Sequence, residues 1–187
     1  MKTKYFSTLL ITSAIAMGAA PALADTADAP KLNFACQANN GVPTTVAQYA
    51  GGEETMTIFT WKQEALQYKT DATPQELCDN VTAKLENYSA EGYDLSKVSF
   101  VGTKEHVTGL PAICASGGSG VPTCSKVLLT LNRSHDAEID AEQVVSAILN
   151  PQLQGEVQKY SDRGIQSTAY QVNFWDLFGL NSKFFAK

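Results

Sequence analysis

Apolar and polar residues alternate from residue 32 onward, and the period of this alternation predicts the first elements. Residues 32–36 alternate with a period of two, and residues 43–49 and 55–61 are rich in Thr, Val and aromatic residues. Both features are typical of half-buried strands. Asn39-Asn40-Gly41 and Gly51-Gly52 separate these segments with residues that favour turns. The pattern predicts an antiparallel meander of three strands.

The period changes to a helical one after residue 73. Apolar side chains recur every three or four residues and form one stripe; they are Leu77, Val81, Leu85 and Tyr88. Thr73, Pro74 and Glu76 supply an N-cap hydroxyl, a proline tolerated in the first turn and the acid of a capping box. A long amphipathic helix is therefore predicted from Thr73 to about Gly92, with Cys78 at the edge of its stripe.

Strand-like segments return at residues 98–103, 106–115 and 125–131. Residues 127–131 are apolar on both faces, which predicts a central strand covered on both sides. A second, shorter helix is predicted over residues 140–150, where Pro151 ends it. This order lacks the strict strand–helix alternation of a parallel sheet. The predicted fold class is α+β: an antiparallel β-sheet with one long amphipathic helix and a second, shorter helix packed on it.

The beginning of the chain has the pattern of a secretory signal peptide over residues 1–24. Lys2 and Lys4 precede an apolar stretch at residues 9–17, and Ala22-Leu23-Ala24 forms a cleavage site. Residues 25–32 are predicted to be a flexible lead-in. No later stretch reaches the ~18 apolar residues of a membrane-spanning helix, so the mature chain is expected not to span a membrane.

Composition and charge exclude several classes of protein. Of 187 residues, 44% are hydrophobic and 18% charged, which excludes a wholly disordered chain and a coiled coil. The 14 Lys and Arg against 19 Asp and Glu give a formal net charge of −5. Cleavage of the leader would remove two of these lysines and bring the charge to about −7. This acidity, without a cluster of Lys and Arg, argues against a nucleic-acid partner.

Export makes the four cysteines informative, because an even number of cysteines in an oxidising compartment favours disulfides. Cys36, Cys78, Cys114 and Cys124 allow three connectivities. Their spacings do not fit a zinc site, and no metal is expected. The pairing of Cys36 with Cys78 and of Cys114 with Cys124 is favoured, since the second pair would close a loop of Gly and Ser that bends without strain.

Candidate catalytic groups are few. A hydrolase needs a base beside its nucleophile, usually a histidine, and neither His106 nor His135 lies beside a nucleophile motif. Gly118-Ser119-Gly120 resembles part of a nucleophile elbow, but the Gly-x-Ser-x-Gly motif fails at Val121. No catalytic residue is therefore predicted, and a hydrolase that uses the Ser116–Gly120 loop is the alternative.

Oxygen-bearing side chains alternate between residues 132 and 140; they are Asn132, Ser134, Asp136, Glu138 and Asp140. A calcium loop would need Gly at its sixth position and Glu at its twelfth, where this chain has Ala137 and Gln143. The acids are better explained as the first turn of a helix, where they stabilise the macrodipole. Glycine motifs that bind phosphate or dinucleotides are missing, so no cofactor is expected.

The last part of the chain, residues 151–187, is interpreted as an aromatic-rich extension of a domain that covers residues 33–150. The extension holds the candidate contact residues Phe174, Trp175, Leu177, Phe178, Phe184 and Phe185. The favoured interpretation is a final helical turn docked on the sheet, because apolar residues are usually buried. The functional interpretation is a segment that contacts a partner or a membrane, with Lys183 and Lys187 at the interface.

The segments around the cysteines also carry a resemblance. They are Phe34-Ala-Cys36, Gly41-Val-Pro-Thr-Thr-Val46, Phe59-Thr-Trp61, Thr73-Pro-Gln-Glu-Leu-Cys78, Pro111-Ala-Ile-Cys-Ala115, and Cys124 with Val127-Leu-Leu-Thr-Leu131. In this order, over residues 33–150, they resemble the circadian oscillating protein family of cyanobacteria, with a departure at Leu77, where Arg is expected. The resemblance implies a cysteine framework and an exported or membrane-peripheral protein of the periplasm or thylakoid lumen, without established catalytic residues.

These observations predict a secreted, non-catalytic binding or accessory protein at a membrane-adjacent surface. Its expected partner is a protein or a membrane surface, and not a nucleic acid. The sequence does not identify the ligand.

Overall fold

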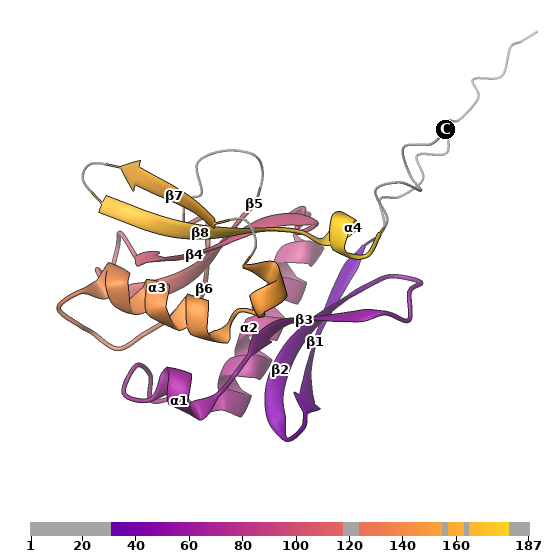
Figure 1. Cartoon of the computed structure of the whole chain (residues 1–187), viewed down its shortest axis with the longest axis horizontal. Helices are drawn as coiled ribbons and strands as arrows, with labels where there is room; N and C mark the ends of the chain where they lie inside the picture. Colours follow the sequence, from indigo (N-terminus) through magenta and orange to yellow (C-terminus); the bar gives the residue numbers. More distant parts are fainter. Residues whose placement is uncertain (1–30, 118–123, 155–156, 163–164, 180–187) are drawn as a thin grey trace, which may run out of the picture.

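The computed structural model describes residues 31–117, 124–154, 157–162 and 165–179. Within them the chain forms two antiparallel sheets and two longer helices, α2 and α3 (Figure 1). The predicted α+β class is confirmed, although the strands divide between two sheets instead of forming one. The predicted signal peptide lies outside the described residues, and the expected lead-in stops short of Leu32, which is already the buried first residue of a strand.

The first sheet is the predicted meander. It consists of β1 (Leu32–Asn39), β2 (Val42–Tyr49) and β3 (Thr55–Thr60), in the order β1-β2-β3. Asn40 and Gly41 join β1 to β2 with φ angles of 50° and 80°. Two positive φ angles in a two-residue loop match the twist of a hairpin, which is why Asn-Gly is favoured there. The turn residues therefore set the β1–β2 register, in which Asn39 lies opposite Val42.

The second sheet has the order β6-β5-β4-β8-β7. Its strands are β4 (Lys97–Lys104), β5 (Pro111–Gly117), β6 (Lys126–Thr130), β7 (Val157–Asp162) and β8 (Ile165–Asn173). The prediction that residues 127–131 form a central strand is wrong, because β6 lies at the edge and β4 in the middle. The apolar character of β6 has another cause: helix α2 (Pro74–Ala90) covers the free edge of this strand.

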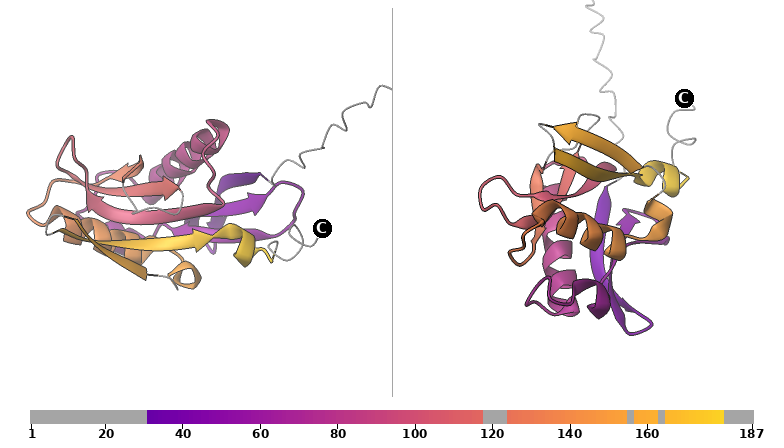
Figure 2. Two further views of the ribbon diagram at one scale, coloured as in Figure 1. Left: turned by 90° about the horizontal axis from the view of Figure 1, so that it is seen from above. Right: turned by 60° about the vertical axis from the view of Figure 1, so that its left-hand side comes forward.

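Helix α2 begins as predicted, with a complete capping box. The amide of Glu76 donates to the Thr73 hydroxyl over 3.3 Å, and the Glu76 carboxylate accepts from the Thr73 amide over 2.8 Å. The buried side chains of α2 are Leu77, Cys78, Val81, Thr82 and Leu85. Figures 1 and 2 show this helix between the two sheets. A short helix that was not predicted, α1 (Gln63–Leu66), precedes it.

Helix α3 (Ala137–Ile148) starts three residues before the predicted position and packs on the five-stranded sheet, mainly against β4. Gly102 in β4 lies directly under it. A Cβ atom at Gly102 would come within 2.6 Å of the backbone of Ala141, so only glycine permits this close approach. A 3-10 turn, η1 (Pro151–Leu153), follows the helix.

The interpretation of residues 151–187 as an extension is wrong for the part that the structure describes. Strand β8 pairs with β4 on one side and with β7 on the other, and α4 (Phe174–Leu177) follows it. Phe174 is fully buried and meets Phe34 of β1 edge-on, with ring centroids 6.5 Å apart. The fold therefore continues past Asn150, and the segment up to Phe178 completes the core.

Both disulfides have the favoured pairing. Cys36 bonds to Cys78 and ties β1 to α2, whereas Cys114 bonds to Cys124 and ties β5 to the residues before β6. In simple chain-entropy terms the longer loop contributes roughly 4 kcal/mol and the shorter one roughly 3 kcal/mol.

Removal of the Phe174 ring should destabilise the protein strongly. Phe174→Ala is expected to lower the free energy of unfolding by about 3–5 kcal/mol, because it leaves a cavity between the two sheets. Leu177→Ala in the same helix is the matched control; Leu177 is 38% exposed, and its loss should cost under ~1 kcal/mol. Urea unfolding measures the free energy of unfolding of both variants. Equal losses in Phe174→Ala and Leu177→Ala would show that α4 does not belong to the core.

Candidate functional site

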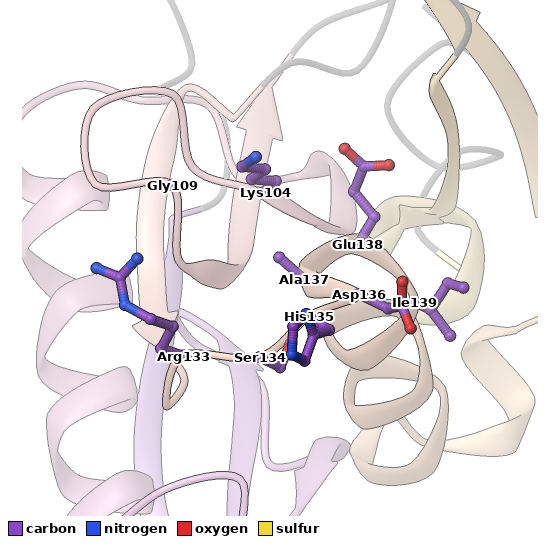
Figure 3. A pocket seen from close by; sticks show the side chains of 9 residues that line it. All are labelled: Lys104, Gly109, Arg133, Ser134, His135, Asp136, Ala137, Glu138 and Ile139. Atoms are coloured by element: carbon purple, nitrogen blue, oxygen red, sulfur yellow. The ribbon is translucent and has the colours of Figure 1, made fainter.

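A pocket of about 610 Å³ opens at one end of the five-stranded sheet, where the β4–β5 hairpin faces the start of α3 (Figure 3). Lys104 and Gly109 line it from the hairpin, and residues 133–139 line it from the other side. The segment between α1 and α2 lies next to it, since the Asn132 amide donates to the Lys69 carbonyl over 2.7 Å. We call residues 62–71, 104–110 and 132–140 together the loop end.

The β4–β5 hairpin is held in shape by its own hydrogen bonds. The amide of Glu105 donates to the Leu110 carbonyl and the amide of Gly109 to the Glu105 carbonyl, both over 2.9 Å. The Glu105 carboxylate also accepts from the amide and the hydroxyl of Thr108. Gly109 has a φ of 69°, which glycine adopts without strain. Val107 is therefore held at the tip of an ordered turn.

The β6–α3 loop is tied to the segment before α2. Lys69 forms an ion pair with Asp140 in the first turn of α3, and the Asn132 side chain donates to the Asp71 carboxylate over 3.3 Å. The hydrogen bond and the positive charge of Lys69 hold the pKa of Asp140 below its usual value of 3.8. The loop end is thus held together by interactions between segments far apart in the sequence.

The pocket carries charges of both signs. Lys104 and Arg133 are basic, and Asp136 and Glu138 are acidic. None of the four takes part in an ion pair within the described residues. Figure 3 shows Arg133 and Glu138 pointing away from one another. The pocket can therefore offer hydrogen bonds and charge to a ligand.

Three large apolar side chains protrude from the loop end. Val107 is 90% exposed, Tyr68 87% and Ile139 53%. Tyr68 also has a φ of 63°, a left-handed conformation that costs a non-glycine residue about 1–3 kcal/mol. Such strained positions cluster at binding sites. Sequence reasoning missed this surface, because each of the three residues is an isolated apolar residue in a polar segment.

The candidate contact residues at the end of the chain divide into three groups. Phe174 and Phe178 are buried, and Phe178 meets Tyr49 of β2 with ring centroids 5.5 Å apart. Leu177 is half-exposed. The side chain of Trp175 and residues 184–185 lie outside the described part of the chain. Phe174 and Phe178 are thus docked in the core, as the favoured interpretation of this segment predicts.

The residues of the alternative hydrolase are separated by the sheet. Ser116 is buried near the far end of β5, opposite Ser99, whereas Pro111 at the start of β5 adjoins the hairpin. Five residues of an antiparallel strand span about 17 Å. His106 and His135 are both exposed in the loop end, beyond Pro111. Residues 118–120 of the proposed nucleophile loop lie outside the described residues.

The alternating oxygen side chains do not converge. Asn132 is bonded to Asp71, and Asp140 is paired with Lys69. Among the residues that the structure describes, no three His, Cys, Asp or Glu side chains are placed to hold a metal ion. The same described residues include no helix that is long and apolar enough to cross a membrane.

The fold defines the chain as an α+β protein of two antiparallel sheets, joined by a central helix and containing two disulfides. The family model of circadian oscillating protein COP23 matches residues 33–178, and the chain belongs to this family. The match extends 28 residues beyond the expected limit at Asn150 and ends at Phe178, where the buried part of α4 ends. No curated protein and no solved structure matches the chain.

Stability should depend on pH through Asp140. A depressed carboxyl pKa stabilises the folded state above the unfolded pKa, and this contribution is lost as the pH falls below about 3.8. Asp140→Asn should therefore lower the free energy of unfolding at pH 7 by up to about 1 kcal/mol, as exposed ion pairs do. The difference from the unmodified chain should therefore become smaller as the pH falls from 5 to 3.

Urea unfolding at pH 7, 5 and 3 measures this difference. Glu64→Gln is the control, since Glu64 is exposed and forms no ion pair within the described residues. A deficit in Asp140→Asn that stays constant over this range would contradict a role for the Asp140 charge.

Proposed function

We propose that this protein is an exported, non-catalytic binding or accessory protein that acts at a membrane-adjacent surface through its loop end. The two disulfides support an oxidising compartment, in agreement with the signal-peptide pattern of residues 1–24. The chain's −5 net charge favours neutral or basic partners over nucleic acid.

The observation that carries the proposal is the exposure of Tyr68, Val107 and Ile139 on three adjoining segments. Single exposed apolar residues are normal, but here three lie on segments that adjoin one another at the loop end, and Ile139 also lines the pocket. An ordered surface loses little entropy on binding, which favours affinity. Buried apolar contacts with polar and charged groups around them are typical of protein interfaces.

The arrangement of possible catalytic groups supports a binding role. His106 and His135 lie at the loop end, and Ser116 lies about 17 Å further along β5. A general base must come within hydrogen-bond reach of its nucleophile, about 2.6–3.2 Å, or act through one water. These histidines therefore do not activate Ser116.

The test compares the binding of three mature chains to the native envelope fraction by co-sedimentation. These are the unmodified chain, Tyr68→Ser with Val107→Ser, and the control Leu177→Ser, whose exposed apolar residue lies at the opposite end. Loss of two apolar contacts should weaken binding at least about tenfold, and the control should bind like the unmodified chain.

Circular dichroism establishes that all three chains are folded. Binding that survives the loop-end substitutions would contradict the loop end as the contact surface. No binding by the unmodified chain would contradict the role at a membrane-adjacent surface.

A further inference from the structure

We propose that the pocket of the loop end binds a short peptide whose amino and carboxyl termini are both free, which makes the ligand a small zwitterion. This inference rests on the proposed function, because it takes the loop end as a binding surface. It adds the chemical class of a ligand for the pocket.

The charges that line the pocket are of both signs and are not used within the fold. Lys104 and Arg133 supply two positive charges. Asp136 and Glu138 supply two negative ones. None of these four side chains forms an ion pair within the part of the chain that the structure describes. Figure 3 shows Arg133 on one side of the pocket and Asp136 and Glu138 on the other, so the pocket has a positive and a negative side.

The positive side suits a carboxylate. A guanidinium group such as that of Arg133 can donate to both oxygens of a carboxylate at once. Next to it α3, a helix of 12 residues, begins at Ala137 and places the positive end of its dipole at the pocket. The side chain of the N-cap residue Asp136 makes no capping hydrogen bond within the described residues, and this leaves the amides of the first turn as donors.

The negative side suits an ammonium group. The carboxylates of Asp136 and Glu138 can accept charge-assisted hydrogen bonds from a peptide's amino terminus. Ala137 and Ile139 also line the pocket, and the Ile139 side chain is 53% exposed. A small apolar side chain of the peptide would cover part of this exposed area, which favours binding.

Ligands with a single kind of charge fit this arrangement less well. A free anion beside Arg133 would also meet two carboxylates, and like charges at a contact lower the affinity. A metal cation would meet Lys104 and Arg133, and no three acidic, His or Cys side chains in the described ranges are placed to hold one. A zwitterion satisfies both sides of the pocket.

The size and the fixed walls of the pocket also suit a small ligand. Its volume of about 610 Å³ lies within the ~300–1,000 Å³ that is typical of small-molecule sites. Hydrogen bonds of Glu105 hold the β4–β5 hairpin, and the ion pair between Lys69 and Asp140 holds the β6–α3 loop. Walls that are ordered before binding lose little entropy on binding.

An NMR titration of the isotope-labelled mature chain with alanyl-alanine tests the inference. Amides at the pocket, such as those of Gly109 and Ala137, should shift and saturate at up to about 10 mM dipeptide, which fills a site of millimolar affinity. The amides of Lys97 and Leu177, which lie at the opposite end of the molecule, should not shift.

Two capped forms of the same dipeptide separate its charges. N-acetyl-alanyl-alanine keeps only the carboxylate, and alanyl-alanine amide keeps only the ammonium group. Each should bind at least about tenfold more weakly than the free dipeptide, because it loses the charge-assisted hydrogen bonds of one side. Affinity of either capped form equal to that of the free dipeptide would overturn the inference.

Two variants assign the two sides of the pocket. Arg133→Gln should weaken binding of the dipeptide about tenfold and leave binding of the amide form unchanged, because that form has no carboxylate. Glu138→Gln should weaken binding of the dipeptide and leave binding of the acetylated form unchanged. Glu64→Gln is the control, since Glu64 belongs to the loop end but does not line the pocket. Unchanged amide signals outside the pocket establish that each variant is folded.

Two further results would overturn the inference: no saturable shift with the dipeptide, or shifts confined to residues outside the pocket. Glycerophosphoethanolamine serves as a second probe, because a phospholipid headgroup can also be a zwitterion. Binding of this compound without binding of the dipeptide would overturn the peptide ligand and assign the pocket to a lipid headgroup.

Envelope binding separates this inference from the proposed function. If the dipeptide does not bind, but Tyr68→Ser with Val107→Ser loses envelope binding, the proposed function stands and the peptide site is overturned. If the dipeptide binds as expected, but envelope binding survives these loop-end substitutions, the peptide site stands and the proposed contact surface fails.

Discussion

Two antiparallel sheets that are not hydrogen-bonded to each other have free edges, and a free edge presents unpaired N–H and C=O groups. Helix α2 covers two of these edges with polar side chains. Towards β1, the Glu86 carboxylate accepts from the Phe34 amide. Towards β6, Lys84 donates to the Leu128 carbonyl over 2.8 Å and Tyr88 to the Val127 carbonyl over 3.1 Å. One helix thus joins the two sheets, with contacts to β1 and β2 on one side and to β6 on the other.

The interior contacts of α2 support this arrangement. Thr45 of β2 accepts hydrogen bonds from the Trp61 indole over 2.9 Å and from the Thr82 hydroxyl over 3.2 Å, so this buried polar group is satisfied as burial requires. The Cys36–Cys78 disulfide lies beside it. Burial lowers the pKa of Lys84, a cost that its bond to β6 offsets. At the third edge, Asn150 donates to the Ile58 carbonyl of β3 over 2.8 Å.

Sequence reasoning predicted the features that local chemistry determines. The Asn40-Gly41 turn, the capping box at Thr73 and the helical stripe of α2 each depend on residues a few positions apart. The cysteine pairing was also predicted, because the loop between Cys114 and Cys124 is short and rich in glycine. The edge position of β6 was not predicted. A strand whose edge is covered by a helix has the same apolar sequence pattern as a strand that pairs with neighbours on both sides. Likewise β8, Ile165–Asn173, has mixed polarity, and only its pairing with β4 shows that it belongs to the sheet.

The loop end could not be predicted either, because it is formed by segments that lie far apart in the sequence. The segments that carry Tyr68, Val107 and Ile139 adjoin through contacts such as the bond between Asn132 and Lys69, which join distant parts of the chain. The conspicuous aromatics Phe174 and Phe178 fill the core, as the favoured docked interpretation predicts, and so do not form the contact surface of the functional interpretation. The exposed apolar residues that remain are few and isolated in the sequence, and only the fold makes them a surface.

Native-state hydrogen exchange under increasing denaturant tests most directly whether α2 makes one cooperative unit of the two sheets. The two amides to compare are those of Phe34, in β1 under α2, and Val101, in the middle of β4. Joined sheets predict that both amides exchange through the same global opening, with the same free energy and the same dependence on denaturant. Exchange of Phe34 at a clearly lower free energy, with a smaller denaturant dependence, would mean that the first sheet opens by itself and would contradict this account.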